Sequence, residues 1–174
     1  MIFALFMDLK QKIDADFKET FRAIDQVALS TLRMLNAAIK NREVEKRTKL
    51  SKTEQDIKKL EELSKLTEDE IIQVVSSEIK RRREAAEQYM QGGRVELAQK
   101  EEKEAKILAG YLPEQLSEEE IRKLVKEAIQ KSNAQGVKDT GKVMGILMPQ
   151  VKGKADGNFV GKIVKEELGD KPET

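Results

Sequence analysis

Seven lysines between Lys131 and Lys165 are the side chains of this chain best suited to bind a ligand. Only two aspartates lie in the same stretch, so its net charge is +5, whereas the whole chain of 174 residues carries only +1. Lysine ammonium groups and the N–H groups at helix starts both attract phosphate oxygens. The stretch therefore predicts contact with a nucleic-acid backbone, and it does not by itself predict a reaction.

The candidate contacts lie on and beside the glycine turns of this basic stretch. Glycine lets a backbone approach a ligand closely, and a neighbouring lysine can then reach a phosphate. The residues that we predict to contact RNA are Gly141, Lys142, Gly145, Lys152, Gly153, Lys154 and Lys162. In the alternative interpretation, Gly141 and Gly145 let two short helices pack closely and the lysines are only solvated, as basic surfaces commonly are.

Three other residues of the stretch bear on the kind of recognition. Asp139 and Asp156 oppose phosphate binding, but each is placed to cap the N-terminus of a helix. Phe159 is the only aromatic residue in the stretch, and its spacing with Val160 and Ile163 predicts that it belongs to the core. We therefore expect recognition of RNA shape through phosphate contacts rather than base stacking.

A second basic run spans Lys80–Arg83, where Arg81 and Arg82 form a second candidate patch for RNA. Arg83 comes one helical turn after Ile79, at the edge of an apolar stripe. Such an arginine usually packs its stem and pairs with a carboxylate on a neighbouring helix, with ligand contact as the alternative. The available carboxylates on the next predicted helix are Glu101, Glu102 and Glu104.

Composition excludes several classes of enzyme. The chain has no histidine and no cysteine, which removes zinc sites with nitrogen or sulfur ligands, thiol nucleophiles and Ser-His-Asp triads. Ser76-Ser77 lies within a predicted helix, where serine hydroxyls usually bond to their own backbone. The stretch Gly141–Gly145 lacks the spacing of a phosphate-binding P-loop. We predict no catalytic residue, no metal and no cofactor.

The spacing of apolar residues predicts an all-α fold. They recur every three or four positions, and no alternating run of useful length predicts a strand. Capping boxes at Thr67–Glu70 and Ser117–Glu120 begin two strong helices, whereas Gly92-Gly93 and Pro149 are expected to end theirs. The expected helices run over residues 8–24, 26–49, 51–63, 68–91, 94–109, 118–131, 140–148 and 157–168.

A break at Tyr111–Leu116 predicts two domains, because a residue before proline resists the helical conformation. Residues 1–111 are expected to form an elongated helical domain with a helical hairpin, and residues 112–174 a small three-helix tail domain. The apolar start, residues 1–7, is too short to span a membrane. It is either an extra turn of the first helix or a mis-assigned start with Met7 as the initiator, and we expect a cytoplasmic protein.

Four stretches resemble a known family. The chain resembles the YqeY proteins, and its C-terminal half resembles the tail of GatB, a subunit of tRNA-dependent amidotransferase. The stretches are Leu32–Lys40, Glu78–Ala85 followed by Gly93-Arg94, Tyr111–Leu116, and Gly141–Met148 followed by Val151–Asp156. The pair YLPEQL and GKVMG…KGKADG is the most specific part of the resemblance.

The resemblance implies an all-helical fold with a small tail domain that, in GatB, is thought to hold the outer corner of tRNA. Family members are often labelled amidotransferase-like, meaning carbon–nitrogen ligation with glutamine as the nitrogen donor. The function that we expect is a non-catalytic tRNA-binding accessory module. The alternative is a scaffold that docks onto an amidotransferase, an aminoacyl-tRNA synthetase or a ribosomal component. Independent amidotransferase activity is disfavoured by the residue content.

Overall fold

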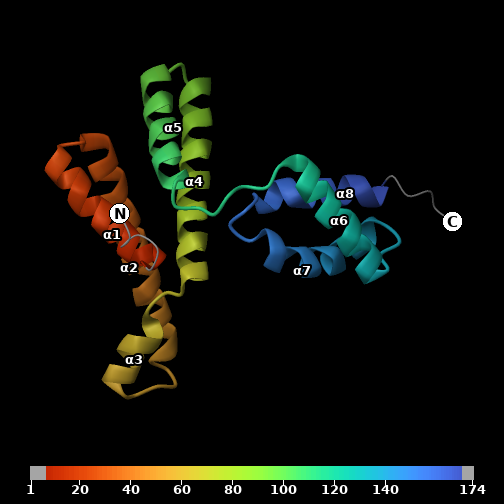
Figure 1. The fold of residues 1–174 in the computed structure, drawn as a ribbon, viewed down its shortest axis with the longest axis horizontal. Helices are drawn as coiled ribbons and strands as arrows, with labels where there is room; N and C mark the ends of the chain where they lie inside the picture. The colour runs from red at the N-terminus through yellow and green to blue at the C-terminus, as the bar shows by residue number, and fades with distance from the viewer. Residues whose placement is uncertain (1–6, 170–174) are drawn as a thin grey trace. The chain divides into compact units, whose positions relative to one another are not determined.

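A computed structural model describes residues 7–169 of the chain. In this part of the chain it contains eight α-helices, one short 3-10 turn and no strand, which confirms the all-α prediction (Figure 1). Packing divides the chain into an N-terminal unit, Met1–Leu112, and a tail unit, Pro113–Thr174. Residues 1–6 of the apolar start lie outside the described residues, so the two interpretations of this start stay predictions. No helix in the described part is long and apolar enough to cross a membrane.

The N-terminal unit contains five helices and the tail unit three. The helices of the N-terminal unit are α1 Leu9–Ala23, α2 Gln26–Leu50, α3 Ile57–Ser64, α4 Glu68–Gln91 and α5 Val95–Ala109. Those of the tail unit are α6 Glu118–Ser132, α7 Thr140–Val151 and α8 Gly157–Gly169, with the 3-10 turn Val137–Asp139 before α7.

Both predicted capping boxes are present. The hydroxyls of Thr67 and Ser117 accept hydrogen bonds from backbone N–H groups of α4 and α6, and Glu70 and Glu120 complete the two boxes. These bonds satisfy N–H groups that a helix start otherwise leaves without partners. They also lower the pKa of Glu120, because the Ser117 N–H and hydroxyl both donate to its carboxylate.

The helices α4 and α5 form the predicted hairpin and lie side by side in Figure 1. Gly92 caps α4, and Gly93 follows with φ of 70°, in the left-handed region that favours glycine. The turn of two glycines thus reverses the chain between two long helices. This hairpin positions the second basic run against α2.

Helices α1, α2, α4 and α5 share the core of the N-terminal unit. Its fully buried side chains are Ile13, Leu32, Leu35, Ile39, Val75 and Leu108. Two apolar residues near the end of the helix expected over residues 8–24, Phe21 and Ile24, are exposed. The helix predicted at 51–63 is also shorter than expected, because residues 51–53 form a turn and α3 begins at Ile57.

The tail unit encloses an aliphatic core of its own. Its fully buried side chains are Val125, Val143, Leu147, Val160, Val164 and Leu168, joined by Ile121, Val151 and Ile163. The prediction that Pro149 ends α7 is wrong, since the helix continues to Val151. Burial of Val151 in the tail core offsets the lost backbone hydrogen bond at the proline.

Candidate nucleic-acid interface

The loop Lys152–Lys154 joins α7 to α8 and holds three of the predicted RNA contacts. Gly153 has φ of 73°, a left-handed conformation that glycine adopts without strain. The side chain of Lys154 is exposed, and Lys152 is half-buried. The loop therefore presents an exposed cation beside a sharply turned backbone.

The segment before α6 fixes the shape of this loop. Gln115 Nε2 donates to the Gly153 carbonyl at 2.7 Å, and the Leu116 N–H donates to the Lys154 carbonyl at 2.8 Å. Both donors belong to the C-terminal part of the YLPEQL stretch, so residues 115–116 and the KGK loop form one structure within the tail unit. The Lys154 side chain is therefore displayed by a backbone that is held on both sides.

Lys142 projects from the first turn of α7 with a side chain that is 68% exposed. Its ammonium lies 2.6 Å from Asp139 Oδ1. This bond, followed by donation from the Gln135 N–H, holds the pKa of Asp139 below its usual range. Asp139 occupies the N-cap position, but its side chain does not cap the helix as predicted. Its carboxylate instead accepts from the Gln135 N–H and pairs with Lys142.

Two glycines of α7 have no packing role in the described structure. A Cβ built on Gly141 or on Gly145 would meet no atom within 4 Å apart from the adjoining backbone of its own helix and its chain neighbours. The same holds for Gly161 in the middle of α8. The alternative interpretation, in which Gly141 and Gly145 let helices pack closely, is therefore wrong. A glycine inside a helix costs about 1 kcal/mol relative to alanine, and nothing in the fold compensates for it here.

Phe159 corrects the prediction about aromatic residues. It lies in the first turn of α8 and is 40% exposed, whereas Val160 and Ile163 are buried as expected. Asp156 does cap this turn, since its Oδ1 accepts from the N–H groups of Asn158 and Phe159. The prediction that no base stacks on this stretch assumed a buried Phe159. Because the ring is partly exposed, that reason no longer holds.

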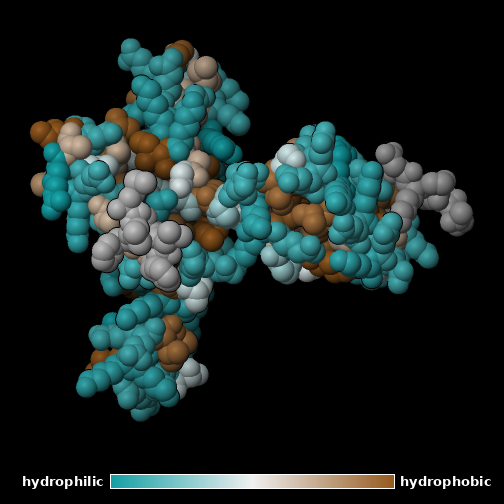
Figure 2. Space-filling view, in the orientation of Figure 1, coloured by the Kyte–Doolittle hydropathy of each residue, from teal (hydrophilic) through white to brown (hydrophobic). Residues whose placement is uncertain are grey.

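The predicted contacts are spread over the tail unit rather than gathered in one pocket. Lys142 and Lys152 lie ten residues apart on α7 and its end, which corresponds to about 15 Å of helix. Lys162 lies on α8 and is exposed. Hydrophilic residues cover most of the visible face of the tail unit in Figure 2. Lysines at this spacing do not form a single site for a small anion.

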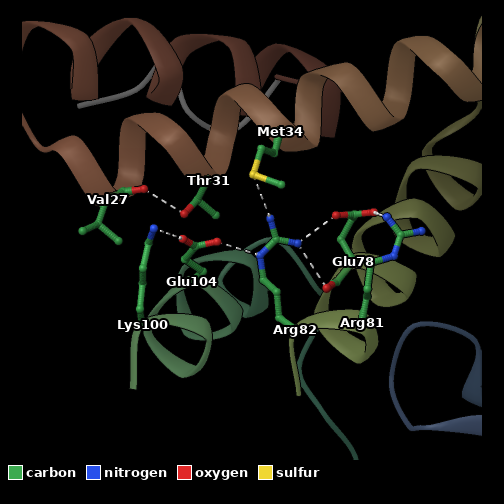
Figure 3. Close-up of polar contacts among 8 residues, drawn as sticks. All are labelled: Val27, Thr31, Met34, Glu78, Arg81, Arg82, Lys100 and Glu104. Atoms are coloured by element: carbon green, nitrogen blue, oxygen red, sulfur yellow. Dashed lines mark hydrogen bonds and ion pairs between the residues drawn. The ribbon is translucent and has the colours of Figure 1, made fainter. Parts of the chain in front are cut away.

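The second candidate patch is divided by burial. Arg82 is 3% exposed and forms a closed network, in which its Nε donates to Glu104 Oε2 at 3.1 Å and its Nη1 to Glu78 Oε2 at 2.8 Å (Figure 3). The other terminal nitrogen faces the Met34 sulfur at 3.8 Å. Arg81 has a side chain that is 76% exposed and reaches the other oxygen of Glu78 at 3.0 Å. Only Arg81 of this pair is on the surface.

The structural role predicted for Arg83 belongs to Arg82. The predicted partner Glu104 is used, but the guanidinium that it binds is the neighbouring one. Arg83 is exposed and lines a groove between α4 and α5. The signal was present in the sequence, because Arg82 lies four residues before Ala86 and seven after Val75, on the same apolar stripe.

The fold and the site define a class of protein in which a helical unit with a hairpin precedes a small three-helix tail that displays exposed lysines near glycines. Within that class, the chain belongs to the family described as Yqey-like protein, whose model matches residues 10–168. The resemblance deduced from the four sequence stretches is thereby confirmed.

Two relatives are similar to this chain. It is 30% identical over 163 residues to Altered inheritance of mitochondria protein 41, mitochondrial, of Pyrenophora tritici-repentis, covering 92% of this chain and 81% of that protein. It is 40% identical over 58 residues to a Glutamyl-tRNA(Gln) amidotransferase subunit of Methanobrevibacter smithii, covering 30% of this chain and 9% of that protein. The second match is a partial similarity to the tail of the archaeal protein.

Proposed function

We propose that the chain is a tRNA-binding accessory module that contacts RNA through its tail unit and has no chemistry of its own. The observation that carries the proposal is that exposed lysines lie beside glycines: Lys142 lies between Gly141 and Gly145, which make no packing contact, and Lys154 follows the left-handed Gly153. These positions expose cations and bare backbone together, which is what close approach to phosphates requires. The tail similarity to a protein named for Glutamyl-tRNA(Gln) supports tRNA as the nucleic acid.

The kind of recognition follows from the surface. Phosphate contacts by lysine supply affinity without sequence, and they fall steeply with salt. The exposed Phe159 ring adds one face on which an unpaired base could stack. We propose binding that depends on RNA shape, with Lys142, Lys152, Lys154 and Lys162 as the main cations.

The similarity to part of an amidotransferase also supports docking onto such an enzyme as part of the same function. A module that holds tRNA beside a larger enzyme needs no nucleophile, in keeping with a chain that has no histidine or cysteine. The cytoplasmic location stays a prediction, and the word mitochondrial in the name of the fungal relative describes that protein.

The first test is binding of the purified chain to total tRNA across a salt series, with duplex DNA as competitor. We expect RNA-selective binding whose log K falls linearly with log salt at a slope of about −0.9 per phosphate contact. Equal competition by DNA would mean that only charge is read. No binding at low salt would overturn the proposal and leave the tail lysines as a solvated surface.

A further inference from the structure

A groove between α4 and α5 has no role in the proposed function. Its volume is about 720 Å³, and small residues, Ala86, Ala105 and Ala109, form part of its lining. Ala86 and Ala105 are each only 5% exposed, so the groove floor is closed by the hairpin itself. Met90 stands at the wall with 54% of its surface exposed.

Four charged side chains of alternating sign line this groove. Arg83 and Glu87 lie four residues apart on α4, and Glu102 and Lys106 lie four residues apart on α5. Opposite charges at this spacing commonly pair along a helix. Within the residues that the structure describes, none of the four forms an ion pair, and all four are exposed. The groove therefore offers two cations and two anions to a partner.

A small ligand of one charge does not fit this pattern, because half of the lining would repel it. A surface whose own charges alternate is instead complementary to a second copy of itself. In a symmetric dimer each residue contacts a residue that contacts it in return. The question is then which two-fold axis pairs the charges.

A two-fold axis that runs across the helices pairs all four charges. It places α4 against the same helix of the second copy in antiparallel orientation, so that Arg83 faces Glu87 of the partner subunit and Glu87 faces Arg83 of the partner subunit. The helix α5 meets its own copy in the same way, which pairs Glu102 with Lys106. The alanines of the floor allow the backbones to approach closely.

An axis that runs along the helices pairs only half of the charges. It preserves the level of each residue, and Arg82 lies opposite Glu104 in the hairpin. Arg83 is then level with Glu102 of the other copy and can pair with it. Glu87 is level with about residue 99 of the other copy, and Lys106 with about residue 80. Neither of these positions lines the groove, so Glu87 and Lys106 stay without a partner. The transverse axis is therefore the one that the charges select.

The same register fixes the orientation of the transverse axis. The midpoint of Arg83 and Glu87 lies about three residues nearer to the hairpin turn than the midpoint of Glu102 and Lys106, which corresponds to about 4.5 Å along the helices. An axis through both midpoints is inclined to the hairpin, so the two hairpins cross rather than lie parallel. Crossed helices with small residues at the contact are a common packing arrangement.

We propose that the groove between α4 and α5 is the interface of a symmetric homodimer, in which α4 crosses α4 of the second copy and α5 crosses α5. This dimer is independent of RNA binding by the tail. It doubles the number of tail units in one assembly without using any residue of the RNA surface.

Sedimentation equilibrium of the full chain, from about 1 μM to about 500 μM, tests the proposal. We expect a reversible dimer in the parent. Arg83→Glu and Glu87→Arg should each weaken dimerisation by about tenfold or more, because symmetry turns two attractive contacts into two repulsive ones. The combined variant with both changes should dimerise within about threefold of the parent, because it restores the transverse pairing.

The matched control is Lys80→Glu combined with Glu84→Lys, which makes the same swap at the same spacing on α4 but outside the groove. It should leave dimerisation unchanged, and circular dichroism should show the same helicity in every variant. A parent that stays monomeric at the highest concentration overturns the proposal. The proposal is also overturned if Arg83→Glu and Glu87→Arg leave the dimerisation constant unchanged. Failure of the double swap to restore a dimer weakened by both single changes overturns the transverse axis.

Discussion

The two units use basic residues in opposite ways. In the N-terminal unit the run Lys80–Arg83 is part of a helix hairpin, and Arg82 is buried with both of its carboxylate partners. In the tail unit, charged residues are excluded from the buried aliphatic core, and Lys142, Lys154 and Lys162 remain on the surface. A basic run in a sequence therefore indicates a ligand surface only where the fold leaves its cations exposed.

The ion pairs of the two units also differ in how far they are exposed to solvent. Arg122 of α6 joins Glu118, Glu166 and Glu167 at distances of 2.7 to 3.1 Å, but this cluster is open to solvent. Exposed pairs of this kind contribute at most about 1 kcal/mol. In the Arg82 network the guanidinium and both carboxylates are buried, so removal of Arg82 leaves two buried carboxylates that only exposed cations can reach.

Replacement of the buried guanidinium should have the largest effect. We expect Arg82→Ala to destabilise the N-terminal unit by about 3 kcal/mol, because the buried carboxylates of Glu78 and Glu104 would lose their only buried partner. Each would keep one exposed cation, Arg81 at 3.0 Å from Glu78 and Lys100 at 3.9 Å from Glu104. Both tyrosines of the chain, Tyr89 and Tyr111, lie in this unit, so tyrosine fluorescence during urea unfolding reports it separately.

The neighbouring arginines provide the controls for this experiment. Arg81→Ala and Arg83→Ala should each cost less than about 1 kcal/mol, because both side chains are exposed. Equal losses in all three variants would show that the Arg82 network is not what sets the two units apart.

The glycines of the tail should behave in the opposite direction. We expect Gly145→Ala combined with Gly161→Ala to stabilise the tail unit by about 2 kcal/mol, since each change removes about 1 kcal/mol of helix cost and creates no clash. Amide hydrogen exchange measured by mass spectrometry resolves the tail unit from the rest.

Binding to tRNA by the same double variant tests whether these glycines contact RNA. If Gly145 serves close backbone approach, the more stable variant should bind tRNA several-fold more weakly. A variant that is both more stable and equally tight in binding would show that these glycines serve neither the fold nor RNA.

High pH should affect the N-terminal unit through Tyr111. Burial, and then the hydrogen bond from its hydroxyl to Asp16 Oδ2 at 2.8 Å, raise the pKa of Tyr111 above its ordinary value. Because the folded pKa is raised, this stabilisation is fully present below the unfolded value of about 10 and is lost as the pH rises above it. The tail unit contains no tyrosine, so this source of alkaline instability is confined to the N-terminal unit.

Unfolding of Tyr111→Phe as a function of pH measures this contribution. We expect the variant to lose about 1 kcal/mol at neutral pH and to show a shallower decline above pH of about 10. Tyr89→Phe removes a hydroxyl from α4 and is the control. If both variants keep the slope of the parent, the contact between Tyr111 and Asp16 does not anchor the end of this unit.

Much of the fold was predictable because local signals and packing agree. The capping boxes at Thr67 and Ser117 and the turn at Gly92-Gly93 act within a few residues, so a sequence pattern contains all the information that they need. The errors occurred where a partner decides the outcome. Phe159 and Ile163 share a helical face, but neighbouring helices cover only Ile163.

The site was predictable as a region but not as an arrangement. The concentration of positive charge in the sequence indicated the tail lysines. No sequence pattern shows that Gln115 and Leu116 bond to the loop at Gly153 and Lys154, because the partners lie 38 residues apart. The choice between Arg82 and Arg83 depended on a step of about 100° around α4. A stripe with steps of three as well as four residues would have selected Arg82.

The most direct test of the contrast between the units is tRNA binding by two matched double variants across a salt series. Lys152→Glu with Lys154→Glu changes the tail loop, and Lys52→Glu with Lys58→Glu changes the net charge equally on exposed positions of the N-terminal unit. We expect the tail variant to bind at least about tenfold more weakly with a salt slope smaller by about two, and the other variant to bind as the parent does. Equal losses in both variants, or none in the tail variant, would contradict the assignment of RNA binding to the tail.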